Sequence, residues 1–335
     1  MDPCSQGLIG ASLACLKAKS NDLRYAAFFG FVGGVSPDLD ILIRSKNDSL
    51  LFIEYHRHFS HSLFFIPFGG FIVSLLLFYF FKNKQSFKKI YLFVTLGFLS
   101  HGLLDACTSY GTSIFWPVSE NRISLNIISI IDPIYTIILL FFLIIGVARK
   151  SSKYFSFGIS ISMLYLFLGL VQKHRVEQSI QRLAKERNHN ISRILIKPTL
   201  GNNILWRSVY QSNDFYYVDA VYTPLFRNSK IKEGVNIKVI DKETIFPELG
   251  YDSIQRQDIR RFSFFSQDFI YLHPDHKDII ADLRYGTLPH DYKSLWGIEI
   301  DLENKNQHVN FRNLRNFKYE EYEDFWSMIK GDFKD

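Results

Sequence analysis

The sequence predicts an all-α helical membrane bundle, with about four spanning helices and a short N-terminal helical hairpin, followed by a soluble α+β domain. Long uncharged apolar runs are confined to the first half of the chain. The second half is polar and aromatic and has no run that could span a bilayer. A mean hydropathy of zero is the average that two such unlike halves give. We therefore divide the chain into a membrane-embedded domain, residues 1–171, and an extracytoplasmic domain, residues 172–335.

The apolar runs of the first half differ in length. Those at residues 7–16 and 23–35 are too short to cross a bilayer at about 1.5 Å per residue, so we expect them to form the hairpin. The run at 62–81 carries no charged side chain and has the length of about 20 residues that one crossing needs. Runs at 90–107, within 125–148 and at 154–171 complete the predicted spans.

Basic residues lie in the loops at one end of these runs. Lys and Arg in short loops stay in the cytoplasm and so orient a membrane protein. The net charge of +6 is therefore a topology signal, and no nucleic acid partner is expected. Up-and-down threading places the following residues on one face: Lys17, Lys19, Arg24, Lys82, Lys84, Lys88, Lys89, Arg149, Lys150 and Lys153. The sequence predicts a multi-pass protein of the bacterial inner membrane, in contact with lipid, whose C-terminal domain is extracytoplasmic.

The second half begins with a polar helical stretch at about 172–187. Strand-like runs follow at 191–196, 203–210 and 215–222, with a turn signal at 212–214. Further alternating segments lie near 236–240, 269–272, 279–285, 295–300 and 308–311, and helices are expected at 253–262 and 320–329. These segments predict the α+β fold.

Histidines and carboxylates collect at the opposite end of the runs. His101 and Asp105 are four residues apart, so on a helix they share a face and could bind one metal ion. His56 and His61 precede the run at 62–81. Taken singly, the first pair is more often a helix-end polar contact, and the second is more often part of an interfacial polar belt.

Asp38 and Asp40 flank a leucine just after Pro37. An extended backbone there could direct both carboxylates the same way, although a helix-terminating turn is the plainer interpretation. The gathering of imidazoles and carboxylates on one predicted face favours a hydrolytic metal centre, with nitrogen and oxygen ligands and a position left for water. Arg57 is then a candidate anion clamp, with a snorkelling interfacial arginine as the alternative.

Five motifs carry a resemblance to a known family: MDPCSQGLIGASLA, GGVSPDLDIL, HRHFSHSL, SHGLLDACTSYGTSIFWP and IDPIYT. In this order and spacing, over about residues 1–145, they resemble the YdjM-like family of membrane-bound metal-dependent hydrolases. That family is grouped by distant similarity with the zinc-dependent phospholipase C and P1 nuclease, which have an all-helical scaffold and a multi-zinc site. The resemblance implies metal binding by His56, His61, His101 and Asp105, with Asp38 and Asp40 as further ligands or as carboxylates that orient ligands and water.

The chain departs from the family pattern at two positions. Gln6 stands where many relatives have histidine, and a neutral amide is a poor zinc ligand. His58 stands where a small residue is common, so it ranks below its neighbours. Asp132 lies in a matched motif, but before Pro133 it could equally be a helix N-cap.

These observations predict an integral membrane hydrolase with one to three divalent metal ions, most plausibly Zn²⁺. The expected substrate is a small molecule or lipid, with a phosphoester or other ester of a lipid or envelope component favoured by analogy. Asp38 or Asp40 would take the proton from water. The alternatives are a membrane transporter or sensor that binds ions or protons through the His and Asp cluster, and a structural anchor for the second domain.

Overall fold

The computed structural model describes residues 1–316 and 318–333 and forms two compact units. The helical unit contains Met1–Leu42, Tyr55–Val171 and Leu200–Asn202. The sheet unit contains Ile43–Glu54, Gln172–Thr199 and the chain from Asn203 onward. The boundary at Val171 falls inside one long helix. The segment Ile43–Glu54 belongs to the sheet unit although the sequence on both sides of it belongs to the helical unit.

The helical unit is built from α-helices with short 3-10 turns between them. Proline and an aspartate cap begin two of the helices: Asp2 accepts a hydrogen bond from Ser5 N–H at 2.9 Å, and Asp132 accepts one from Tyr135 N–H at 3.1 Å. The elements in chain order are α1 (Pro3–Lys17), η1 (Ser20–Asp22), α2 (Leu23–Val35), η2 (Ser36–Leu42), α3 (Leu51–Tyr55), η3 (Phe59–His61), α4 (Ile66–Phe81), α5 (Phe87–Ala106), α6 (Pro133–Arg149) and α7 (Ser152–Glu186).

Helices α1, α2 and α5 pack closely against one another. Their shared core includes the buried side chains of Cys15, Phe29 and Val94. Gly97 of α5 makes the close approach possible, because a Cβ atom there would lie 2.1 Å from the Gly30 carbonyl oxygen of α2. The expected N-terminal helical hairpin is therefore present as α1 and α2, and α5 packs directly on it.

The expectation of about four spanning helices is wrong. Among the described residues, α7 is the one helix long and apolar enough to cross a membrane, and a second span results only if the bent pair Leu51–His61 and Ile66–Phe81 counts as one. The apolar runs in the sequence are longer than the helices that form from them. Helix α4 has 16 residues and α6 has 17, fewer than the roughly 20 that a crossing needs. Helix α5 has 20 residues, but it carries Lys88, Lys89 and Asp105.

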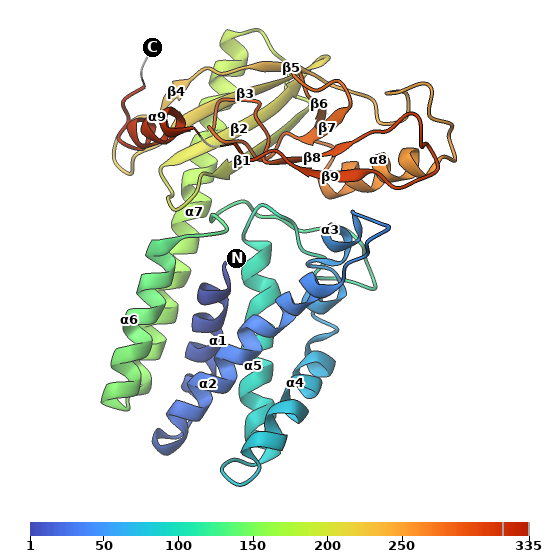
Figure 1. The fold of residues 1–335 in the computed structure, drawn as a ribbon. Coiled ribbons are helices and arrows are strands. Elements are labelled where there is room, and N and C mark those ends of the chain that lie inside the picture. Colours follow the sequence, from blue (N-terminus) through green and yellow to red (C-terminus); the bar gives the residue numbers. More distant parts are fainter. Residues whose placement is uncertain (317, 334–335) are drawn as a thin grey trace. The chain divides into compact units, whose positions relative to one another are not determined.

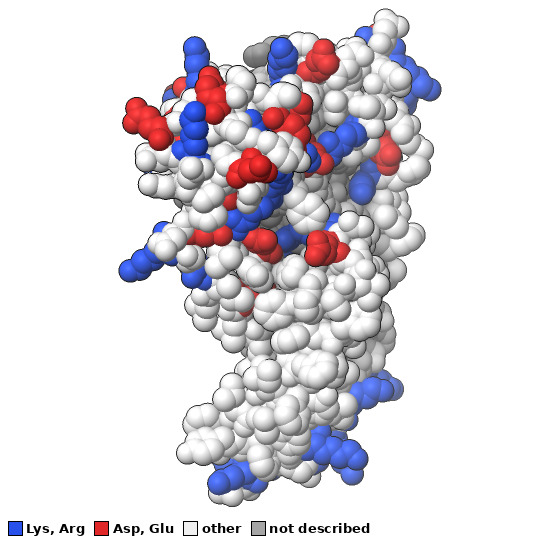
Figure 2. Space-filling model, turned by 90° about the vertical axis from the view of Figure 1, so that its right-hand side faces the viewer, with Lys and Arg blue, Asp and Glu red and all other residues white. Residues whose placement is uncertain are grey.

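Basic turns mark one end of the helical unit. The connections between α1 and α2, α4 and α5, and α6 and α7 lie at the same end of the unit (Figure 1). Figure 2 shows Lys and Arg gathered at this end, below a broad uncharged surface. Exposed apolar side chains contribute to the surface of the unit; they include Phe68, Leu76, Phe80, Ile137, Ile144, Leu164 and Phe167.

The sheet unit contains two antiparallel sheets. The first has the order β1-β2-β3-β4, with β5 also paired to β3, and the second has the order β6-β7-β8-β9. The elements are β1 (Arg193–Pro198), β2 (Leu205–Ser212), β3 (Phe215–Tyr222), β4 (Lys230–Lys232), β5 (Asn236–Lys238), α8 (Ile254–Phe265), β6 (Ile270–Leu272), β7 (Ile279–Asp282), β8 (Trp296–Glu299), β9 (Asn310–Asn313) and α9 (Tyr319–Ile329). The predicted strands and helices of the second half are present, and the structure also contains β4, which was not predicted.

Both faces of the first sheet are covered. On one face Leu195 and Val218 join Tyr271 of the second sheet in a buried cluster. On the other face Trp206 and Ile196 pack against the last turns of α7, from which Ile180 is fully buried. Successive residues of a strand point to opposite faces, so burial on both faces accounts for the nearly unbroken burial of β2.

Candidate metal centre

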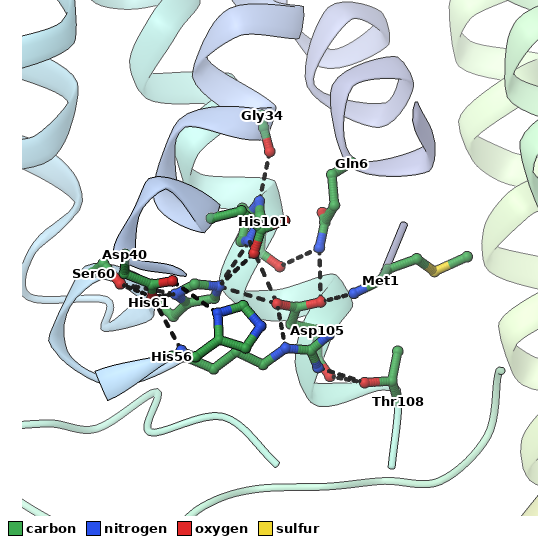
Figure 3. A network of polar contacts seen from close by, with 12 residues as sticks. Met1, Gln6, Gly34, Asp40, His56, Ser60, His61, His101, Asp105 and Thr108 are labelled. Carbon is green, nitrogen blue, oxygen red and sulfur yellow. Dashed lines mark hydrogen bonds and ion pairs between the residues drawn. The ribbon is translucent and has the colours of Figure 1, made fainter. Parts of the chain in front are cut away.

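The ends of several elements of the helical unit meet at one buried cluster of polar side chains (Figure 3). Asp38 and Asp40 come from η2, which directly follows α2. His61 ends η3, and His101 and Asp105 lie in the last turns of α5. The cluster lies at the end of the helical unit opposite the basic turns, because α2 and α5 both start at those turns and finish here (Figure 1).

Gly102 lets η3 approach α5. A Cβ atom on this residue would lie 2.3 Å from the carbonyl oxygen of His61, so a larger residue would push η3 away from the helix. The close approach brings the His61 ring against the His101 ring, with 4.5 Å between the ring centroids.

The hydrogen bond of His101 Nδ1 defines the tautomer of this ring. Nδ1 lies 2.5 Å from the Gly34 carbonyl oxygen, which can only accept a hydrogen bond. Nδ1 therefore carries the proton, and Nε2 of the neutral ring presents its lone pair to the cluster.

His61 is oriented in the same way by Ser60 and Asp40. The Ser60 hydroxyl donates to Asp40 Oδ2 at 2.5 Å, so its oxygen is left to accept from His61 Nδ1 at 3.0 Å. Asp40 Oδ2 also lies 3.2 Å from the same nitrogen. Nδ1 of His61 is thus a donor, and its Nε2 is the ring nitrogen that faces His101.

The Nε2 atoms of the two rings face each other. His61 Nε2 and His101 Nε2 are 2.8 Å apart. Asp105 Oδ2 lies 3.1 Å from the first nitrogen and 3.4 Å from the second, and Asp38 Oδ1 lies 3.4 Å and 3.3 Å from them. Two imidazole nitrogens and two carboxylate oxygens at one buried point favour a positive charge, which a proton on one imidazole or a bound cation can supply.

The remaining atoms of Asp105 are held by neighbours. Gln6 Nε2 donates to Oδ1 at 2.9 Å, and the Met1 amine forms an ion pair with the same oxygen. Arg57 Nε lies 3.2 Å from Oδ2, while Arg57 Nη1 donates to Thr108 Oγ1 at 2.8 Å. Oδ2 is buried and accepts no hydrogen bond from the described residues, so it is the oxygen directed at the two imidazoles.

Asp40 organises the neighbouring part of the site. It accepts from His56 Nδ1 at 2.8 Å and from the Arg57 backbone N–H at 3.0 Å, in addition to Ser60. Burial acts to raise the pKa of Asp40, but the hydrogen bonds from His56 and His61 outweigh it and hold the pKa well below its usual range. Asp40 is therefore an ionised carboxylate that orients two imidazoles.

The structure brings the predicted site residues together in two overlapping groups. Asp38, His61, His101 and Asp105 can each offer one ligand atom, with all four atoms within 4.8 Å of one another. Asp38, Asp40 and His56 form the second group by the same criterion. Arg57 lies beside the first group with its guanidinium directed at Asp105 and Thr108. The individual roles of these residues remain predictions.

Three further residues named from the sequence, His58, Asp132 and Gln6, lie outside the two groups of candidate ligands. His58 packs against Trp116, with 5.6 Å between ring centroids, and belongs to neither of the two groups. Asp132 is the N-cap of α6 and also accepts from Tyr165 Oη at 2.9 Å. Gln6 supports Asp105 through its amide nitrogen. The support from Ser60 and the Gly34 carbonyl was not predicted; Ser60 could have been noticed as the hydroxyl next to His61, whereas a backbone carbonyl leaves no signal in the sequence.

The donor set fits a divalent metal ion. Imidazole nitrogens and carboxylate oxygens are the ligands of hydrolytic zinc sites. Imidazoles that bind metal usually donate their other N–H to a carboxylate, hydroxyl or carbonyl group, which both His61 and His101 do here. The described residues of the helical unit therefore include a site that could hold a metal ion.

A helical unit with such a cluster at one end defines a candidate metal-binding protein with an apolar surface. A family model described as YdjM inner membrane protein matches residues 1–176, more than half of the chain. The chain belongs to this family of inner membrane proteins.

Two relatives extend the comparison. The chain is 26% identical over 271 residues to the uncharacterized protein YfhP of Bacillus subtilis (strain 168), covering 77% of this chain and 76% of the relative. It is 32% identical over 99 residues to the inner membrane protein YbcI of Escherichia coli (strain K12), covering 28% of this chain and 55% of the relative. No solved structure matches the chain.

Proposed function

We propose that the chain is an integral membrane metal-dependent hydrolase whose centre binds zinc through His61, His101 and Asp105, with Asp38 beside the position left for water. The observation that carries this proposal is the 2.8 Å approach of the two Nε2 atoms beside the carboxylate oxygens of Asp38 and Asp105. A bound cation could supply the positive charge that this arrangement favours, with His61, His101 and Asp105 as ligands and one tetrahedral position left for water. The site has room in its ligand set for one to three ions, since Asp40 and His56 adjoin it.

The residues around the proposed zinc site have different roles in the proposed reaction. A bound zinc ion supplies Lewis acidity and lowers the pKa of a coordinated water towards about 7. We assign the acceptance of the water proton to Asp38, because 22% of its side chain is exposed, whereas 1% of the Asp40 side chain is. Asp40 instead holds His56 and His61 in place. Arg57 contributes positive charge beside Asp105, and its use as an anion clamp stays a prediction.

The proposed substrate is a phosphoester of a lipid or envelope component. The candidate centre lies at the end of the helical unit away from the basic turns. If those turns are cytoplasmic, the site is at the extracytoplasmic face, at the depth of lipid headgroups. The likeness to zinc-dependent phospholipase C and P1 nuclease belongs to this proposal as an analogy of chemistry.

Metal analysis of the purified protein tests the function. The full chain, extracted in detergent without chelators, is expected to contain zinc by mass spectrometry and to hydrolyse at least one phosphoester of a screened panel. His61→Ala should lose both properties while His58→Ala keeps them, since His58 packs on Trp116. A wild-type protein that contains no metal and takes up none from zinc solutions would refute the proposal.

Reporter fusions test the orientation. Alkaline phosphatase joined after residue 335 should be active, and green fluorescent protein at the same place should be dark. The pattern should reverse for fusions in the α4–α5 turn after Lys84. A fluorescent fusion at the C-terminus would place this terminus in the cytoplasm and contradict the extracytoplasmic assignment.

A further inference from the structure

The segment Ile43–Glu54 connects two parts of the candidate metal centre. Two residues separate it from Asp40 and one separates it from His56, and the side chains of Asp40 and His56 are hydrogen-bonded at 2.8 Å. The segment itself belongs to the sheet unit. Contacts that hold this segment in the sheet unit therefore also restrain the short connections from the segment to Asp40 and to His56.

Arg261 of α8 binds this segment through its whole guanidinium group. Nη1 and Nη2 donate to the two carboxylate oxygens of Asp48 at 3.2 Å and 2.9 Å. Nε donates to Glu54 Oε2 at 3.1 Å, and Nη1 also donates to Asp258 at 2.8 Å. A forked contact of this kind defines direction as well as distance, which a single point charge does not.

A second attachment joins the segment to β9. The Ser49 hydroxyl donates to the Val309 carbonyl oxygen at 2.5 Å and accepts from the Phe311 N–H at 3.1 Å. The rings of Phe52 and Phe311 meet edge to face, with 5.1 Å between centroids. Leu50 is 1% exposed, so the segment is packed into the sheet unit as well as hydrogen-bonded to it.

The acidic residues around Arg261 already have a cationic partner. Asp48, Asp258 and His308 have ligand atoms close enough to hold an ion. The positive charge they need is already present, because Arg261 donates to both aspartates. His308 Nδ1 lies 3.0 Å from Asp258 Oδ2, which also accepts from the Val309 N–H. The group is an arginine clamp that holds the segment.

We propose that the sheet unit positions the candidate metal centre by clamping Ile43–Glu54 through Arg261, so that Arg261 is a positioning residue for Asp40 and His56. The inference rests on the proposed function only where its test measures zinc affinity. The clamp holds the segment at Asp48 and Glu54, and the continuous chain on either side transmits this restraint to residues 40 and 56. The sheet unit thereby has a role in the chemistry of the helical unit without contributing a ligand.

The backbone amide of Arg57 reports on this positioning. It donates to Asp40 Oδ2, so its hydrogen exchange depends on Asp40 staying in place. Arg261→Met in the full chain should speed exchange at Arg57 and weaken binding of zinc by about 10-fold, the effect typical of losing a supporting residue. Arg260→Met is the matched control, because Arg260 lies on the same helix and pairs with Glu243 at 2.6 Å. Arg261→Lys should restore part of both properties.

The outcomes separate this inference from the proposed function. If Arg261→Met matches Arg260→Met in exchange at Arg57 and in zinc affinity, the positioning role is refuted. If the wild-type protein binds no zinc, the proposed function fails and the exchange comparison alone decides the inference. If Arg261→Met does not fold, Ser49→Ala replaces it, with smaller changes in the same direction expected and unchanged Arg57 exchange as the refuting result.

Discussion

The chain contains two clusters of aspartate and histidine with opposite characters. In the helical unit, His61 Nε2 and His101 Nε2 face each other at 2.8 Å beside two carboxylates. In the sheet unit, Arg261 already neutralises Asp48 and Asp258, and His308 makes an ordinary contact with Asp258. The number and type of ligand residues are similar in the two clusters. The comparison teaches that a candidate metal site is recognised by imidazole nitrogens that face each other, and not by the number of nearby aspartates and histidines alone.

Removal of one imidazole from each cluster is expected to give the largest contrast. His101→Ala should reduce zinc affinity by more than about 100-fold, because a proposed direct ligand is lost and supporting residues alone are worth about 10- to 100-fold. His308→Ala should leave the zinc content unchanged. Metal analysis and competition titration of both variants measure the difference, and equal losses would remove the distinction between the clusters.

Zinc should protect one cluster and not the other. Arg57 N–H donates to Asp40 in the helical unit, and Val309 N–H donates to Asp258 in the sheet unit, both at 3.0 Å. At a free zinc concentration 100 times the dissociation constant, a ligand stabilises the state it binds by about 2.7 kcal/mol. Hydrogen exchange at Arg57 should slow by up to about 100-fold on adding zinc and recover with a chelator. Exchange at Val309 should not respond; a matching response there would contradict the assignment.

An isosteric change of one carboxylate in each cluster has a smaller expected effect. Asp105→Asn should weaken zinc binding by about 10-fold or more while membrane insertion is retained, because the amide is close in shape but uncharged. Asp258→Asn should leave zinc binding unchanged and lower the stability of the sheet unit by about 1–3 kcal/mol, since Arg261 loses a buried charged partner. Zinc titration and urea unfolding measure the two effects. Unchanged zinc affinity in Asp105→Asn would remove Asp105 from the ligands.

The smallest expected effect belongs to a supporting amide. Gln6→Ala removes the 2.9 Å hydrogen bond to Asp105 Oδ1 but no proposed ligand. A net contribution of about 1 kcal/mol for such a bond corresponds to a loss of about 5-fold in zinc affinity. Gln255→Ala is a suitable control, because Gln255 is equally buried and caps a loop of the sheet unit. A loss as large as that of His101→Ala would make Gln6 a ligand.

Local patterns in the sequence were enough for much of the sheet unit and for the composition of the site. The strand predicted at residues 215–222 coincides with β3, because its turn signal and apolar character are both local. The six predicted metal ligands lie at the ends of sequence segments, and the packing of the helices brings these ends together. The tautomer of His101 could not be predicted, since its partner is the backbone of Gly34.

The errors and omissions have physical causes as well. The run at residues 62–81 gives a helix that starts only at Ile66, because Ser62 and its neighbours form a turn before Pro67. The span count was therefore too high. The attachment of Ile43–Glu54 to the sheet unit was not predicted. Asp48 and Arg261 are 213 residues apart, and the sequence around either residue does not indicate that they pair. Strand β4, with three residues, was too short to show alternation.

The hydrogen bond from His101 to Gly34 also bears on the transport of protons. A histidine relays protons when one ring nitrogen accepts a proton while the other releases one. A backbone carbonyl can neither take up a proton at neutral pH nor pass it to a following group, so Nδ1 of His101 cannot exchange its proton while this 2.5 Å bond holds. A proton pathway through the helical unit would have to bypass this ring.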